Sequence, residues 1–540
     1  MARTPLLSSI RRMVRELRTA RATGIPVDEL RDQRAERRAE RGPSRRQVLA
    51  GAGAAAALLA VPRLARAKTD PVIAIVGGGI AGLNCARELA DRNIAATVYE
   101  ASGRVGGRMF SNRTGYWAGN QVTEWCGELI DTGHKTVRQL CRKFSLPLDD
   151  LHAAEPAGST EVYRFGGTYY PKAQADADFL AMFDAIDADV TAAGYPTTYD
   201  AYTASGLALD QLSIYDWIES RVPGGHGSPL GQLLDVAYNI EYGAETTEQS
   251  SLSLLYLLGF QPSNDSLDVF GESDERFHIR GGNEQLPEAI AASLGNAVVT
   301  GQKLAKLRAT AGGRYQLTFD HGNSSSTITA DYVVLALPFA VLANLDIGGA
   351  GFDALKLQAI NELGRGHNGK LQLQFASRGW LGTGPWPGVA NGSTYSDTGY
   401  QASWEATRAQ SGAAGILNLY SGGAVTDGMH TTAAFATATD AKVRADATRG
   451  LAQLAPVFPG LCHNGRTTQS LPHRSPFFGA SYSYWKVGQY TGFSGYEKAR
   501  QGGVLFCGEH TSQDFQGFME GGASEGERAA KQIARLLGRP

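Results

Sequence analysis

Three glycines and one carboxylate near residue 77 have the types and spacing of a dinucleotide-binding loop. Gly77, Gly79 and Gly82 form G-x-G-x-x-G, and Glu100 follows 23 residues after the first glycine. Glycines permit a tight turn and a close backbone approach to a pyrophosphate, and a carboxylate at this spacing can accept hydrogen bonds from ribose hydroxyls. Because Glu100 disfavours a 2′-phosphate, the pattern predicts an ADP-containing dinucleotide without that group.

The segment directly after Glu100 carries a second anion-binding pattern. In GRVGGRMFS, residues 103–111, Arg104 and Arg108 are interspersed with glycines. Guanidinium groups next to bare backbone suit the phosphates of a cofactor. We therefore expect both arginines to bind the cofactor.

The flanking sequence predicts the elements that must position these residues. Residues 72–76 form a continuous apolar run typical of a buried parallel strand, an amphipathic helix begins near Ile80, and residues 95–100 form a second strand. Residues 506–530 combine a strand end, a polar turn and a helix whose start is crowded by Gly517, Gly521 and Gly522. Glycine is unfavourable within a helix, so we expect these positions to be bare for contact with a large group.

The run EASGRVGGR, residues 100–108, resembles the flavin amine oxidase family, which includes monoamine oxidases, polyamine oxidases and L-amino-acid oxidases. Residues 277–291, 330–338 and 506–530 resemble later segments of the same family. The resemblance implies an FAD cofactor. It also implies that Gly508 and Glu509 approach the ribityl-pyrophosphate, and that the helix start at Met519 points at the flavin pyrimidine ring.

The expected architecture is an α/β fold with two domains. A Rossmann-like FAD-binding domain is assembled from three separated segments, 70–130, 270–345 and 465–540, and a mixed α+β substrate-binding domain comes from 131–269 and 346–464. Residues 312–334 alternate like a β-hairpin with its turn at DHGN.

Three residues are candidates for the chemistry of amine oxidation. The resemblance places Tyr482 and Phe518 at the two walls of an aromatic cage that aligns the amine. It also matches Lys370 to a lysine that is linked through water to flavin N5 and to oxygen reactivity. Alternation in the strand around Lys370 leaves a second interpretation open, a solvated lysine on a polar strand face.

Ser481 stands where monoamine oxidases carry the cysteine that bonds covalently to the flavin, so the resemblance implies non-covalent FAD. The five cysteines contain no C-x-x-C pair, and the chain contains no H-E-x-x-H motif. We therefore expect no metal site. The sequence leaves undecided whether two of the cysteines form a disulfide bridge.

Two carboxylates are candidates for substrate recognition. Glu128 and Asp131 lie in EWCGELIDTGH, residues 124–134, which matches the segment that lines the family's cavity. Polyamine oxidases place an acid near Asp131, so this pair could select a cationic substrate. The alternative is that Asp131 and Thr132 cap the helix that follows.

The net charge of −2 is divided unevenly along the chain. Residues 1–67 carry a balance of +9, and the remainder carries −11. The basic segment contains the twin arginines Arg45 and Arg46, a short apolar run and a small-residue cleavage site at Ala65–Ala67. This order resembles a twin-arginine export signal, so we expect export by the Tat machinery to a periplasmic or extracellular location, and no nucleic-acid partner.

The predicted function is oxidative deamination of a small-molecule amine, with O2 as electron acceptor and hydrogen peroxide as product. One alternative is an L-amino-acid oxidase, for basic amino acids among others, that holds the carboxylate with Arg164 or Arg378. A flavin desaturase and a non-catalytic binding protein are further alternatives. A homodimer is one assembly that the sequence allows.

Overall fold

The computed structural model describes residues 70–262 and 266–539, so the predicted export signal at 1–67 lies outside the described residues. Its first sheet has five parallel strands in the order β23-β13-β1-β2-β9. Their bounds are Ile73–Val76 (β1), Thr97–Tyr99 (β2), Val298–Val299 (β9), Tyr332–Leu335 (β13) and Val504–Phe506 (β23).

Alternate side chains of β1 face two different cores. Ile73 and Ile75 pack with the helices on one face, and Ala74 and Val76 pack with a small four-stranded sheet on the other. The helices are α4 (Ile80–Ala90), α5 (Lys135–Lys143), α11 (Gln285–Leu294) and α17 (Met519–Leu536). A parallel sheet covered on both faces explains why residues 72–76 read as a continuous apolar run.

The small sheet has the order β12-β11-β10-β14. Its strands are β10 (Lys303–Ala309), β11 (Tyr315–Asp320), β12 (Ser325–Ala330) and β14 (Asp346–Gly349). Asp320 of β11 pairs with Ser325 of β12 in antiparallel register, which confirms the hairpin predicted at DHGN.

A larger sheet of eight strands has the order β20-β21-β16-β19-β18-β17-β6-β7. Neighbouring strands are antiparallel except β6 and β17, which are parallel. The bounds are Thr160–Phe165 (β6), Thr168–Tyr170 (β7), Asn368–Phe375 (β16), Ala390–Ser396 (β17), Ala402–Glu405 (β18), Gly415–Gly422 (β19), Phe435–Thr437 (β20) and His463–Ser470 (β21).

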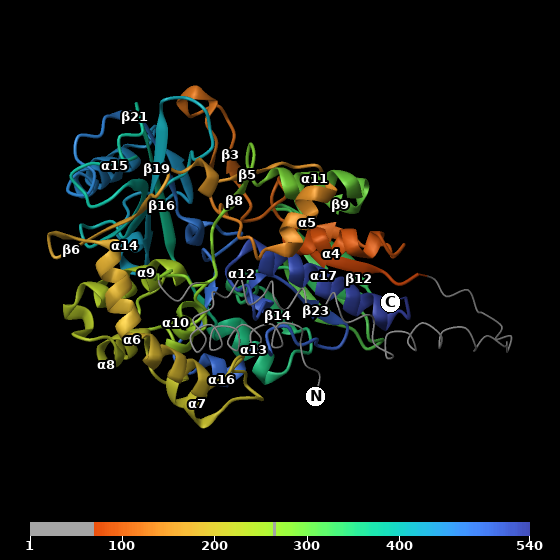
Figure 1. Cartoon of the computed structure of the whole chain (residues 1–540). Helices are drawn as coiled ribbons and strands as arrows, with labels where there is room; N and C mark the ends of the chain where they lie inside the picture. Colours follow the sequence, from red (N-terminus) through yellow and green to blue (C-terminus); the bar gives the residue numbers. More distant parts are fainter. Residues whose placement is uncertain (1–69, 263–265, 540) are drawn as a thin grey trace, which may run out of the picture. The chain divides into compact units, whose positions relative to one another are not determined.

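Helices α6 to α10 group together beside the eight-stranded sheet (Figure 1), and α9 contacts four of its strands. They are α6 (Lys172–Ala193), α7 (Ala204–Asp210), α8 (Ile214–Arg221), α9 (Pro229–Tyr242) and α10 (Ser251–Leu258). Their apolar side chains form one buried cluster with residues of the sheet such as Tyr163 and Tyr395. Among the described helices, none has the length and apolar character that crossing a membrane requires.

Helices α4 and α17 lie against one another at very short range (Figure 1). A side chain at Gly526 of α17 would place its Cβ 2.1 Å from the carbonyl oxygen of Ala81 in α4. At Gly82 of α4 the Cβ would lie 2.0 Å from the carbonyl oxygen of Gly77. The third glycine of the G-x-G-x-x-G motif is therefore required by packing of the helix against its own loop.

Candidate active site

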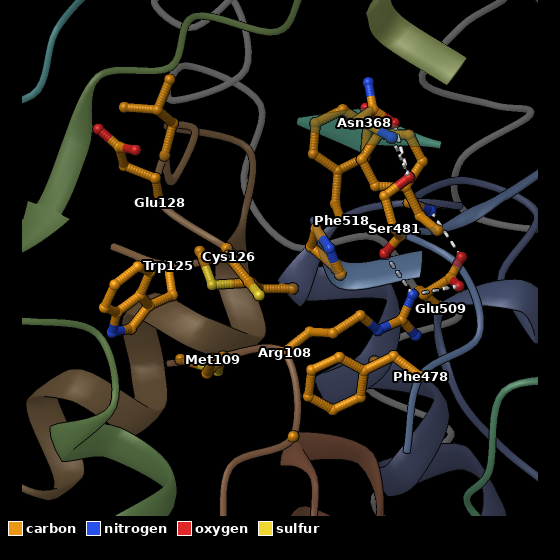
Figure 2. Close-up of a pocket in the computed structure, with 18 of the residues that line it drawn as sticks. Arg108, Met109, Trp125, Cys126, Glu128, Asn368, Phe478, Ser481, Glu509 and Phe518 are labelled. Atoms are coloured by element: carbon orange, nitrogen blue, oxygen red, sulfur yellow. Dashed lines mark hydrogen bonds and ion pairs between the residues drawn. The ribbon is translucent and has the colours of Figure 1, made fainter. Parts of the chain in front are cut away.

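One cavity connects the glycine loop with residues of the eight-stranded sheet. At one end it is lined by Gly77, Gly79 and Glu100. Elsewhere it is lined by 106–109, 125–129, 368–370, 481–482 and 516–519. Figure 2 shows Glu128 and Trp125 on one side of this space and Ser481 and Glu509 on the other. Segments that are far apart in the chain thus converge on a single site.

The Glu100 carboxylate is fixed at the end of β2. Its Oε2 accepts a hydrogen bond from the backbone N–H of Gly78 at 2.7 Å, and its Oε1 accepts from the N–H and hydroxyl of Ser102 at 2.8 and 2.7 Å. Oε2 can accept a further hydrogen bond, whereas both lone pairs of Oε1 are occupied. Glu100 is therefore preorganised, and it lines the cavity where the dinucleotide motif predicts a ribose.

The two predicted phosphate-binding arginines have different positions. Arg108 lines the cavity and donates to the carbonyl oxygen of Ser481 at 2.7 Å and to Glu509 Oε1 at 3.1 Å (Figure 2). Arg104 is not among the cavity-lining residues. It donates to the Gly107 carbonyl at 2.5 Å and to Glu284 at 3.3 Å, so it supports the loop from behind.

The closing segment supplies Gly508, Glu509 and Met519 to the cavity wall. Burial raises the pKa of the Glu509 carboxyl, but the charge of Arg108 and hydrogen bonds from Ser483 and Gly517 hold it below its usual value. Gly508 and Gly517 have positive φ angles of 149° and 86°. Both positions therefore favour glycine on conformational grounds.

Gly521 does not line the cavity, and its lack of a side chain has an internal reason. A Cβ at this position would lie 2.0 Å from the carbonyl oxygen of Phe515. At Gly522, which does line the cavity, the Cβ would lie 2.9 Å from a methyl group of Ile80. Helix packing thus accounts for part of the glycine-rich helix start that we had expected to be bare for the cofactor.

His510 indicates that the cavity fits a polar cofactor. The side chain is 2% exposed and lines the cavity, and neither ring nitrogen has a hydrogen-bond partner within the described structure. Burial lowers its pKa to about 4, so the ring is neutral at pH 7 and offers one donor and one acceptor. Buried polar atoms normally have partners, and a bound group with phosphate or hydroxyl oxygens would provide them.

The predicted aromatic cage residues, Tyr482 and Phe518, both line this cavity. The Tyr482 hydroxyl donates to the carbonyl oxygen of Ile240 at 3.0 Å and lies 3.0 Å from the Tyr420 hydroxyl. The Phe518 ring packs edge-on against His134, with ring centroids 5.3 Å apart. Both rings are held in place by contacts on their outer sides. Sequence reasoning did not single out Trp404, which also lines the cavity.

Lys370 is 6% exposed, so the interpretation as a solvated lysine is wrong. Its Nζ donates to Glu128 Oε2 at 2.6 Å and to the carbonyl oxygen of Cys126 at 2.7 Å. Burial raises the pKa of Glu128, but the charge and hydrogen bond of Lys370, together with the hydrogen bond from Trp404, hold it below its usual value. Trp404 and Asn418 also donate to Glu128, so this carboxylate is fully engaged by the protein.

Asp131 lines the cavity, but it does not cap the helix after it. It accepts hydrogen bonds from the Ser273 hydroxyl at 2.9 Å and from the Glu275 N–H at 3.0 Å, and burial raises its pKa to about 6. The cap comes from Glu520 of α17 instead, which accepts from the N–H groups of Thr136 and Val137, each at 2.8 Å. The capping alternative for Asp131 and Thr132 is therefore wrong.

Three cavity-lining carboxylates were missed by sequence reasoning, namely Glu161, Glu241 and Glu275. They come from β6, from the end of α9 and from the loop before residue 277, so nothing in their local sequence connects them. Arg164 and Arg378 are absent from the cavity lining. Arg378 pairs with Glu405, with 2.5 Å between Nε and Oε1.

All five cysteines are free, so the disulfide that the sequence left open is absent. Cys126 lines the cavity (Figure 2), and burial raises the pKa of its thiol to about 11. At neutral pH it is therefore a protonated thiol of low nucleophilicity.

Residues 80–534 match the family model described as flavin containing amine oxidoreductase. The chain is 23% identical to nicotine dehydrogenase of Pseudomonas putida over 91% of its own length and 94% of that protein. It is 28% identical to L-amino acid dehydrogenase of Synechocystis over 42% of its own length. It spans only 48% of that dehydrogenase, and 57% of a probable flavin-containing monoamine oxidase A of Dictyostelium discoideum.

Among solved structures, cyclohexylamine oxidase from Brevibacterium oxydans superimposes with a TM-score of 0.71 at 19% identity, covering 87% of this chain and 100% of that one. At this identity the superposition shows the fold alone. The matched span of the family model covers most of the chain and contains Gly82, Glu100 and the closing segment of the cavity, while Gly77 and Gly79 precede it. The chain therefore belongs to the family of flavin-containing amine oxidoreductases.

Proposed function

We propose that this protein is an FAD-dependent amine oxidase. In this reaction a primary or secondary amine loses two electrons and two protons to give an imine, and O2 takes them up as hydrogen peroxide. Water then converts the imine to a carbonyl compound and ammonia or a smaller amine. The observation that carries the proposal is the single cavity in which the dinucleotide loop meets Tyr482, Phe518 and Lys370.

Family membership implies a flavin, and the glycine loop with Glu100 supports FAD as its form. When bound, FAD would supply the hydride acceptor. Gly77, Gly79 and Glu100 would hold the adenosine and pyrophosphate, and Arg108 and Glu509 would lie beside the remaining part. We propose non-covalent binding, because the Ser481 hydroxyl is engaged at 2.6 Å with Asn368 Oδ1 and Cys126 stays a neutral thiol.

An amine is favoured over an amino acid by the charges in the cavity. An α-carboxylate calls for a cationic partner, and the two permanently cationic side chains among the lining residues are both engaged. Arg108 pairs with Glu509, and Lys370 pairs with Glu128. This argument weighs against the L-amino-acid oxidase alternative.

The proposal is tested with purified protein. Its absorbance spectrum should be that of an oxidised flavin, and an amine added without oxygen should bleach it. Oxygen should then restore the colour and release one peroxide per turnover. A flavin that no amine bleaches, or one that amino acids alone bleach, contradicts the proposal. Acid precipitation should leave the yellow colour in the supernatant, because the cofactor is expected to be non-covalent.

We also propose that residues 1–67 direct export through the twin-arginine pathway. Changing Arg45 and Arg46 together to lysine keeps the charge but removes the guanidinium pair. The precursor should then accumulate in the cytoplasm, which fractionation and immunoblotting can measure. Normal export of the double variant would contradict the proposal.

A further inference from the structure

Besides Glu100, which Gly78 and Ser102 hold, four carboxylates line the cavity without a cationic partner. They are Asp131, Glu161, Glu241 and Glu275. Glu128, the fifth carboxylate in this part of the wall, pairs with Lys370. The remaining four come from four different segments, so the grouping is a product of the tertiary fold.

Two of the four carboxylates form no hydrogen bond or ion pair within the described chain. Asp131 accepts two hydrogen bonds, as described above, and Glu161 accepts one from the Tyr163 hydroxyl at 2.5 Å. The side chains of Glu241 and Glu275 form no hydrogen bond or ion pair with any described residue, although both are half-buried. Half-buried carboxylates without partners are costly, so a structural role does not explain them.

The neighbours of these two side chains make that cost larger. Burial raises the pKa of Glu275 to about 8, and the charge of Asp131 adds to the effect. Burial, followed by the charges of Glu275 and Asp131, also raises the pKa of Glu241. The charged group that opposes this for Glu275 is Arg408, which is engaged with Glu155 and does not line the cavity.

The same cavity holds the proposed cage. The carbonyl oxygen of Ile240, the residue before Glu241, accepts the hydrogen bond from the Tyr482 hydroxyl. A substrate whose reacting nitrogen lies between Tyr482 and Phe518 therefore has Glu241 along the same wall. A second cationic group on that substrate would supply the partner that Glu241 and Glu275 lack.

We propose that Glu241 and Glu275 form a subsite for a second cationic group of the substrate, so that the preferred substrates are diamines, polyamines or amines with a distal guanidinium. This inference rests on the proposed amine oxidation for its substrate. The binding of a dication to the subsite is separate from the reaction, and it can be measured on its own.

The test compares 1,4-diaminobutane with 1-aminobutane, which have the same chain length and differ by one cationic group. The holoprotein should have a higher kcat/KM for the diamine. Glu241→Gln and Glu275→Gln keep the shape but cannot become charged beside a bound cation, and each should lower kcat/KM for the diamine roughly ten- to hundredfold. The monoamine should change less than about threefold. Glu527→Gln, which alters a carboxylate paired with Lys531 on the outside of α17, is the control.

The outcomes separate the inference from the proposed function. Equal kcat/KM values for the two amines in the wild type, or equal losses for both in the variants, overturn the inference and leave amine oxidation in place. If no amine is oxidised, the subsite is tested by measuring the thermal denaturation temperature of the protein with each compound. Stabilisation by the diamine alone, lost in Glu241→Gln and Glu275→Gln, supports the subsite, and no difference between the compounds overturns it.

Discussion

Replacing Lys370 by methionine should lower the free energy of unfolding, because Lys370 forms a buried ion pair with Glu128. The two side chains are 8% and 7% exposed, and 2.6 Å separates Nζ from Oε2. Methionine keeps the length of the side chain but leaves a buried carboxylate without its counter-charge. Removing one partner of such a pair costs about 3–5 kcal/mol of folding free energy. The double variant Lys370→Met/Glu128→Gln should recover much of that loss, because no uncompensated charge remains.

The loss should also depend on pH in a defined direction. The pKa of Glu128 is below its usual value in the folded protein, so the pair contributes stability above about pH 4.5 and loses it as the pH falls. In Lys370→Met, burial still raises the pKa of Glu128, but the charge of Lys370 no longer lowers it, so the Glu128 carboxyl binds a proton more readily. The difference in unfolding free energy between wild type and variant should therefore be large at pH 7.5 and smaller near pH 4.5.

Urea denaturation at the two pH values measures these free energies. Lys531→Met, which breaks an exposed pair with Glu527, is the matched control and should change stability by less than about 1 kcal/mol. Stopped-flow measurements on Lys370→Met should show slower flavin reoxidation by O2. A stability within 1 kcal/mol of wild type at pH 7.5, or no recovery in the double variant, would refute the reasoning.

Three further predictions concern single residues. Glu520→Ala removes the acceptor for two N–H groups of α5 and should lower the unfolding free energy by about 1–3 kcal/mol in urea; an unchanged midpoint contradicts this. Glu275→Gln should match wild-type stability at pH 5 and exceed it at pH 9 by at most about 4–5 kcal/mol. The reason is that stability linked to the raised pKa of the Glu275 carboxyl is lost from the wild type as the pH rises through about 8. A difference in stability that does not depend on pH would be inconsistent with this prediction. Glu100→Ala should weaken FAD binding to apoprotein by about 1.5–3 kcal/mol in a fluorescence titration, and an equal dissociation constant would remove the ribose assignment.

The parts of the site that the sequence predicts correctly are local. The strand, the glycine loop, the helix and Glu100 lie within about thirty residues, and the physical requirements of a dinucleotide loop apply to that stretch alone. Arg104 shows the limit of this reasoning. Its pattern is right for an anion site, but its guanidinium donates to Glu284, 180 residues further along the chain, and does not line the cavity.

Burial that depends on distant segments could not be predicted. The alternation in β16 correctly places Lys370 on a polar face, but that face is covered by residues 118–128 rather than by solvent. The local sequence offers Asp131 as one alternative cap for α5, whereas Glu520, from a segment almost 400 residues away, accepts from the N–H groups of this helix. Glu241 and Glu275 could be recognised as a pair only once the fold had placed both on one cavity wall.

The order of strands in the five-stranded sheet has a consequence for synthesis of the protein. β1 is among the first elements of the described chain to leave the ribosome, yet its neighbour β13 begins at Tyr332, and β23 closes the edge of β13 only at Val504. At about 5–20 residues per second, roughly 20–90 s pass between Ile73 and Val504. During that time the nascent chain holds an apolar strand with an unpaired edge, the kind of edge that templates aggregation. The segment with Gly508, Glu509 and Met519 is made after every other segment that lines the cavity, so a nascent chain can complete its cofactor cradle only after residue 519 has been synthesised.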